Sequence, residues 1–98
     1  MAYRLAPGAR DDLDAIWDHV AREARDEGPA DRLIEAIAER LWLLAEHPRI
    51  GRPRDDLDSG LRSFPVGNFV IVYEVTDGDV SVLRIVHGRQ DLWSLFGD

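Results

Sequence analysis

The sequence contains no cysteine and no lysine. Without cysteine there are no disulfides, thiolate metal ligands or cysteine nucleophile, and this composition fits the reducing cytoplasm, where we expect the protein to reside. The three histidines lack metal-ligand spacing, so neither a metal site nor an organic cofactor is expected. No apolar run approaches the ~18 residues that cross a bilayer, and the start MAYRLAP has no signal-peptide core, so no membrane association is expected.

A broad basic surface is also missing. All twelve basic residues are arginine, and nineteen acidic residues outnumber them, which gives a net charge of -7. Autonomous binding of nucleic acid is therefore not expected, because phosphate binding depends on a broad basic surface. Residues 1–47 hold eleven acids and six arginines (-5), whereas residues 48–98 hold eight acids and six arginines (-2). The second half is the better place for an anionic contact.

The chain length and the apolar spacing predict one small domain that begins with a strand and two helices. Residues 1–98 suffice for a single core and leave no room for a second domain. A short strand is expected at Tyr3–Leu5. Apolar stripes with helical spacing follow in Leu13–Ala24 and Ala30–Glu46, and Gly28-Pro29 is expected to separate the two helices. The resulting α-hairpin needs a sheet on which to bury its stripe.

The last third of the sequence predicts three antiparallel strands, at Leu61–Val66, Phe69–Thr76 and Val80–His87. The dipeptides Gly67-Asn68 and Asp77-Gly78 suit two-residue hairpin turns, which fix the pairing register. Tyr73 is then expected opposite Arg62 and Val82, and Ile71 opposite Phe64 and Arg84. The segment before these strands, residues 47–60, is predicted to be a loop.

Alternation along these strands sorts the side chains onto two faces, both rich in apolar residues. The face expected to pack on the helices carries Phe64, Val66, Phe69, Ile71, Tyr73, Val75, Val80, Val82 and Val86, with Arg62 and Arg84. The opposite face carries Leu61, Val70, Val72, Leu83 and Ile85, with Ser63, Glu74, Ser81 and His87. This second face is too apolar for solvent, so it needs a cover. The apolar tail of residues 92–96 is either a structural lid there or is displaced or supplemented by a partner helix.

The order of these segments resembles the RelE/ParE superfamily of bacterial toxins over essentially the whole chain. The most characteristic pieces are DDLDAIW (11–17), HPRIGRPR (47–54), GLRSF (60–64), VIVYEV (70–75) and RIVHGRQD (84–91). The resemblance implies an α+β fold with an N-terminal short strand, an α-helical hairpin packed on a small antiparallel β-sheet, and a short apolar C-terminal tail. It also implies the toxin of a type II toxin-antitoxin pair, neutralised by a cognate antitoxin protein.

The superfamily divides by target. Its RelE-like members cleave mRNA on the ribosome, and its ParE-like members inhibit DNA gyrase without a hydrolytic site. The nucleases' strand arginine falls on Val70, their paired lysines near Asp58 and Gly60, and their terminal tyrosine near Leu95, so that only Arg89 has a counterpart. The resemblance therefore favours a ParE-like gyrase inhibitor. A ribosome-dependent mRNA endonuclease and a non-toxic antitoxin-binding module are the alternatives.

Three sets of candidate site residues follow. Antitoxin contacts are expected at Val70, Val72, Glu74, Leu83, Ile85, Trp93 and Phe96, and target contacts at Arg89, Leu92, Trp93 and Leu95. If the protein is a nuclease, the candidates are His87, Arg89, Arg49, Arg52 and Arg54. In that case His87 is the acid/base and Arg89 the phosphate anchor. Otherwise they are a strand-end histidine and an arginine paired with Asp91.

Three further side chains, those of Tyr73, Arg62 and Arg84, are interpreted as structural, and the role of a fourth, Trp42, stays open. Tyr73 is expected to be buried on the helix-packed face with a partner for its hydroxyl. Arg62 and Arg84 are expected on the same face, where each must reach an acid or the rim because an unpaired buried charge is costly. Trp42 lies beside the main apolar stripe of the second helix, where it either flanks the core or contacts a partner.

Overall fold

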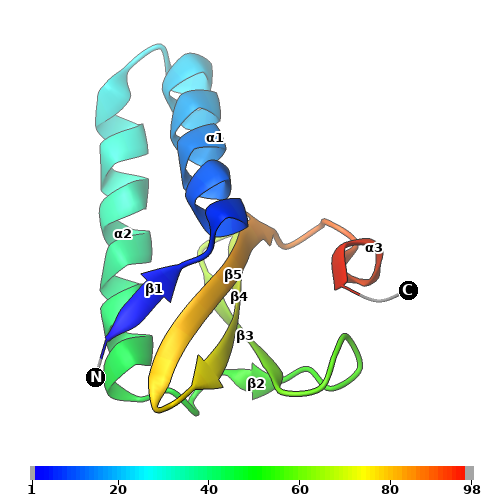
Figure 1. The fold of residues 1–98 in the computed structure, drawn as a ribbon. Coiled ribbons are helices and arrows are strands. Elements are labelled where there is room, and N and C mark those ends of the chain that lie inside the picture. Colours follow the sequence, from blue (N-terminus) through cyan, green and yellow to red (C-terminus); the bar gives the residue numbers. More distant parts are fainter. Residues whose placement is uncertain (1, 97–98) are drawn as a thin grey trace.

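The computed structural model describes residues 2–96, which form a five-stranded sheet with a helical hairpin on one face and a short helix on the other (Figure 1). In chain order the elements are β1 (Tyr3–Leu5), α1 (Pro7–Ala24), α2 (Glu27–Glu46), β2 (Arg52–Pro53), β3 (Leu61–Val66), β4 (Phe69–Thr76), β5 (Asp79–His87) and α3 (Leu92–Phe96). The strand order is β1-β5-β4-β3-β2, with β1 parallel to β5 and the other neighbours antiparallel. The expected α+β fold is confirmed, and the expected apolar tail folds as α3.

The two predicted hairpin turns set the register of the central strands. Gly67 has a φ of 55°, as a type II′ turn requires at its first position, and Asp77 and Gly78 have φ values of 53° and 82°, as a type I′ turn requires at both. Tyr73 lies opposite Arg62 on β3 and Val82 on β5, as predicted. The turn residues alone therefore fix the pairing next to each turn.

A β-bulge in β5 overturns the expected pairing beyond Tyr73. Tyr73 pairs with Val82 but Val72 pairs with Arg84, so Leu83 is an extra residue on β5. An extra residue reverses the facing of everything beyond it. Ile71 therefore lies opposite Ile85 and not opposite Arg84 as expected.

The same shift reverses the end of β5. His87 lies opposite Phe69, and Val86 lies opposite Val70. The predicted faces of Ile85, Val86 and His87 were therefore wrong, because the sequence pattern was extended through the bulge. The Arg84 side chain still reaches Asp12 of α1 on the helix-packed side, as expected.

The connection between the helices is shorter than expected. Helix α1 ends before Arg25, whose left-handed backbone (φ 54°) caps it. The side chain of Asp26 then caps α2 by accepting a hydrogen bond from the Gly28 N–H at 3.2 Å. Gly28 and Pro29 lie in the first turn of α2, which begins at Glu27. Proline is tolerated there because the first N–H groups of a helix have no intrahelical acceptor.

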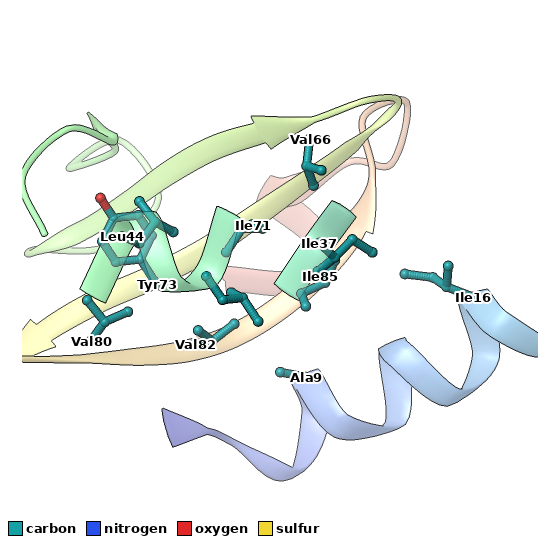
Figure 2. Close-up of a cluster of buried hydrophobic side chains, with 11 residues drawn as sticks. Ala9, Ile16, Ile37, Leu44, Val66, Ile71, Tyr73, Val80, Val82 and Ile85 are labelled. Atoms are coloured by element: carbon teal, nitrogen blue, oxygen red, sulfur yellow. The ribbon is translucent and has the colours of Figure 1, made fainter. Parts of the chain in front are cut away.

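The main core lies between the sheet and the helical hairpin, and we call it the helix-side cluster. Its buried members are Ala9, Ile16, Ile37, Leu41, Leu44, Val66, Ile71, Tyr73, Val80, Val82 and Ile85. Figure 2 shows Ile37 and Leu44 of α2 lying against the strand residues, with Ala9 and Ile16 on α1 at the side. Tyr73 is fully buried here, as predicted.

The segment predicted as a loop, residues 47–60, contains the two-residue strand β2. Arg52 pairs with Ser63 and Pro53 with Arg62 of β3, so β2 forms the outer edge of the sheet. An edge position suits Pro53, since proline cannot donate to a ladder. After β2 the chain turns back, and the side chain of Leu57 is buried.

Candidate functional site

The sheet face away from the hairpin carries a second apolar cluster, which we call the tail-side cluster. Leu57, Leu61 and Val72 are its buried members, and Val70, Leu83, Leu92 and Phe96 pack against them half-buried. The last two side chains come from α3, which lies across the sheet from α1 and α2 (Figure 1). Helix α3 is thus a lid over part of this face, and Leu57 packs into the same cluster from the segment that follows β2.

The residues expected to contact an antitoxin fall in three environments. Val70, Leu83 and Phe96 lie half-buried in the tail-side cluster. Val72 is fully buried there, so a partner reaches it only if its cover moves. Ile85 is 1% exposed in the helix-side cluster and does not share this face. The bulge at Leu83 removes Ile85 from the surface on which it was expected.

The remaining expected contact residues lie around α3. Trp93 is 53% exposed, Leu95 is half-buried, and Leu92 packs into the tail-side cluster. On the sheet, Glu74 is half-buried opposite Leu61. Helix α3 therefore turns one side to the sheet and presents Trp93 outward.

His87 and Arg89 are neighbours at the end of β5. The Nδ1 atom of His87 accepts a hydrogen bond from the Arg89 N–H at 3.1 Å, so the neutral imidazole carries its proton on Nε2. The His87 ring also meets Phe69 edge-on, with the ring centroids 5.5 Å apart.

Arg89 has an exposed side chain with no ion pair among residues 2–96. The expected pairing with Asp91 is wrong, because the Asp91 carboxylate accepts hydrogen bonds from Trp93 N–H and Ser94 Oγ at the start of α3.

The other three nuclease candidates do not join this pair. Arg49 lies beside Val75 and Gly78, at the opposite end of β4 from Phe69 and His87. Six residues of extended strand separate the two ends, which is roughly 20 Å. The fold therefore does not bring Arg49 to His87.

Arg52 and Arg54 lie at the β2 edge of the sheet. Arg52 is exposed on β2 itself. Arg54 donates hydrogen bonds to both carboxylate oxygens of Asp56 at 3.1 Å, and this hydrogen bonding lowers the pKa of Asp56. Arg54 is thus engaged by a carboxylate next to it in the chain.

A network of hydrogen bonds fixes the loop that precedes β2. The Tyr73 hydroxyl donates to the Pro48 carbonyl at 2.7 Å and accepts from the Gly51 N–H at 2.9 Å, while burial raises the Tyr73 pKa. Arg62 donates to the Gly51 carbonyl at 2.8 Å and to the Arg49 carbonyl at 3.2 Å. The prediction of a partner for Tyr73 is confirmed. Arg62 is satisfied by backbone carbonyls instead of an acid.

Arg84 does reach an acid, as predicted. Its Nε and terminal nitrogen donate to the Asp12 carboxylate at 2.8 and 3.0 Å, and this hydrogen bonding raises the pKa of Arg84. Asp12 also accepts the Ile85 N–H at 2.8 Å. A carboxylate on α1 thus ties the helix to β5 next to the bulge.

Sequence reasoning missed Leu57 and Asp12. Leu57 is a lone apolar residue among Asp55, Asp56 and Asp58, and that isolation was a usable signal for burial. Asp12 had no such signal, because several aspartates of α1 look alike in sequence and only one meets β5.

Within residues 2–96, no helix is long and apolar enough to cross a membrane. Nor does this part of the chain gather three or more His, Cys, Asp or Glu side chains that could hold a metal ion.

A helical hairpin packed on one face of a small sheet is the fold that the resemblance to the RelE/ParE superfamily implies. Residues 3–92 match the family model described as the ParE toxin of the type II toxin-antitoxin system parDE. The chain is 31% identical over 91 residues to Toxin ParE1 of Mycobacterium tuberculosis (strain ATCC 25618 / H37Rv), covering 92% of each. It is 36% identical over 85 residues to Toxin ParE1 of Caulobacter vibrioides, covering 87% of this chain and 86% of that one. The protein belongs to the ParE toxin family.

Two solved structures share the fold. A chain of the chromosomal ParDE toxin-antitoxin system from P. aeruginosa superposes with a TM-score of 0.76 at 25% identity, covering 89% of this chain and 95% of that one. A chain of the toxin-antitoxin complex RelBE2 from Mycobacterium tuberculosis gives a TM-score of 0.66 at 26% identity, covering 88% and 95%.

Proposed function

We propose that this ParE toxin blocks DNA gyrase by binding to it, without hydrolysing nucleic acid, and that a cognate antitoxin neutralises it. The separation of Arg49 from the neighbouring His87 and Arg89 carries this proposal. A ribonuclease needs its acid/base and its phosphate anchors within reach of one phosphate. Here Arg49 lies at the far end of the sheet from His87 and Arg89. The β4 position of the nucleases' arginine is Val70, which offers no charge to a phosphate.

The proposed antitoxin site is the tail-side cluster. An amphipathic helix fits such a surface when its apolar residues recur at i, i+3 or i+4, and i+7. Val70 and Leu83 are half-buried at the sheet, and α3 contributes Leu92 and Phe96. A five-residue helix is a short lid, so we expect the antitoxin to displace it or to pack beside it. The two structures that share this fold come from toxin-antitoxin systems, which supports a partner of this kind.

The proposed target contact includes Arg89 and the outward side of α3, where Trp93 is exposed. Tryptophan and arginine are the residues most often found at interaction hot spots. Because this surface borders the tail-side cluster, an antitoxin bound there obstructs it sterically. Neutralisation then needs no change in the rest of the fold.

Two assays run in parallel on the antitoxin-free protein test this proposal. One measures gyrase supercoiling of relaxed plasmid, and the other measures mRNA cleavage on programmed ribosomes. Lost supercoiling with intact mRNA is the expected result. Cleaved mRNA with normal supercoiling contradicts it and makes His87 and Arg89 the first residues to substitute. Normal results in both assays, without growth arrest on expression, identify a non-toxic antitoxin-binding module.

A further inference from the structure

Residues 47–51, between α2 and β2, combine a firmly held backbone with outward side chains, and we call them the presentation loop. Three of its residues, Pro48, Arg49 and Gly51, are hydrogen-bonded through their backbone to Tyr73 or Arg62. Gly51 is buried against Tyr73, and a Cβ added there would collide with the tyrosine hydroxyl and ring. The loop therefore has little freedom to change its backbone.

The side chains at the centre of this loop face solvent. Ile50 is 46% exposed, although it is a large apolar residue, and Arg49 is exposed with no ion pair among the described residues. They border an open hollow of about 480 Å³ that Val75 and Gly78 help to line. Neither side chain is a member of the buried core, although the backbone that carries them is fixed by hydrogen bonds to the core residue Tyr73.

This combination is what a protein-binding surface needs. A loop that is already ordered loses little conformational entropy when it binds. An exposed arginine next to an exposed apolar residue provides one charged and one apolar anchor, a pairing common at hot spots. The nearby Arg52 and His47 add further donors, and Glu46 is the one acid that lines the hollow.

We infer that the presentation loop is a second contact with the gyrase protein, where a carboxylate receives Arg49 and an apolar pocket receives Ile50. This inference rests on the proposed function. Gyrase-bound DNA fits less well, because Ile50 has no use against a phosphate and Glu46 repels one. The hollow beside the loop is lined by Val75, which packs against the helix-side cluster, whereas the proposed antitoxin site is the tail-side cluster on the opposite sheet face, so we expect antitoxin binding not to depend on the loop.

The test compares gyrase inhibition by the wild type with that of Arg49→Glu and Ile50→Ser. Arg40→Glu is the matched control, because Arg40 is also exposed, lies on α2 and forms none of the described ion pairs. Binding to immobilised gyrase is measured with and without plasmid DNA, and circular dichroism checks that each variant is folded. Affinity for the antitoxin is measured in parallel.

The expected result is that Arg49→Glu and Ile50→Ser each need at least tenfold more toxin for half-inhibition, while Arg40→Glu and antitoxin affinity stay at wild-type values. If the wild type inhibits gyrase and both loop variants do so equally well, the inference is wrong and the proposed function stands. If the defect appears only when DNA is present, the loop contacts DNA and the protein contact is wrong. A wild type that does not inhibit gyrase overturns the proposed function together with the inference.

Discussion

Replacing Asp12 with alanine should cost this small domain a large part of its stability. One carboxylate, that of Asp12, connects the first helix to the last strand. It accepts two hydrogen bonds from Arg84 and one from the Ile85 N–H. These partners lie 72 and 73 positions away in sequence. Alanine removes all three of these hydrogen bonds between α1 and β5 at once.

The size of the loss follows from exposure. Ile85 is 1% exposed, so its N–H loses its acceptor where water has poor access, which costs about 1–3 kcal/mol. The ion pair is only partly buried, with 32% of the Arg84 side chain and 15% of the Asp12 side chain exposed, and it adds about 0.5–1 kcal/mol. The expected total is about 1.5–4 kcal/mol, which corresponds to a fall in Tm of roughly 6–32 °C for a domain of this size.

Urea denaturation followed by tryptophan fluorescence measures this loss. Asp12→Asn keeps one oxygen for the Ile85 N–H and is expected to lose less than Asp12→Ala. A double-mutant cycle with Arg84→Ala isolates the ion pair, for which we expect a coupling of about 1 kcal/mol or less. A cost below about 0.5 kcal/mol for Asp12→Ala would refute the assignment of an unsatisfied Ile85 N–H.

Three further predictions concern the loop and the two sheet faces. Gly51→Ala is expected to lower stability by about 1–3 kcal/mol in thermal melting, because the added methyl group meets the Tyr73 hydroxyl; an unchanged Tm would contradict that close fit. Burial raises the pKa of Tyr73, so its contribution to stability is complete below the unfolded pKa of about 10 and is lost as pH rises through the folded value. In a Tyr3→Phe variant, the tyrosinate absorbance should therefore rise at higher pH in the folded protein than in denaturant. Coincident titration curves for the folded and denatured protein would contradict the raised pKa of Tyr73. Val70→Asp should weaken antitoxin binding while the domain stays folded, whereas Ile71→Asp should unfold the domain by burying a charge. Calorimetry measures the binding and circular dichroism measures the folding. An unfolded Val70→Asp variant together with a folded Ile71→Asp variant would contradict the assignment of the two sheet faces.

Local chemistry predicted the elements and the first pairings well. The two-residue turns at Gly67 and at Asp77-Gly78 leave few registers for the neighbouring strands, so the position of Tyr73 on the helix-packed face followed from sequence. The helical stripes were equally plain. These signals are all local, because each depends only on residues that lie close together in the sequence.

The bulge at Leu83 could not be predicted in this way. Of the residues that follow the bulge, the neighbours Ile85 and Val86 are both apolar, so a shift by one position exchanges one apolar side chain for another on each face. The candidate contact residue Ile85 was misplaced for this reason. The separation of Arg49 from His87 could not be predicted from the sequence for a different reason. It depends on the end of the sheet at which the loop lies and the end at which β5 finishes.

The pairing of β1 with β5 also determines when this protein can become a folded toxin during synthesis. Tyr3 lies beside Val80, and the Val80 N–H donates to the Ala2 carbonyl, so the first strand has no partner until the last strand has been made. Contacts between such distant segments form late and slowly, because a long loop must close first. The nascent chain therefore carries β1 without its strand partner until β5 has been synthesised. A complete fold of this domain is possible only from that point in translation onward.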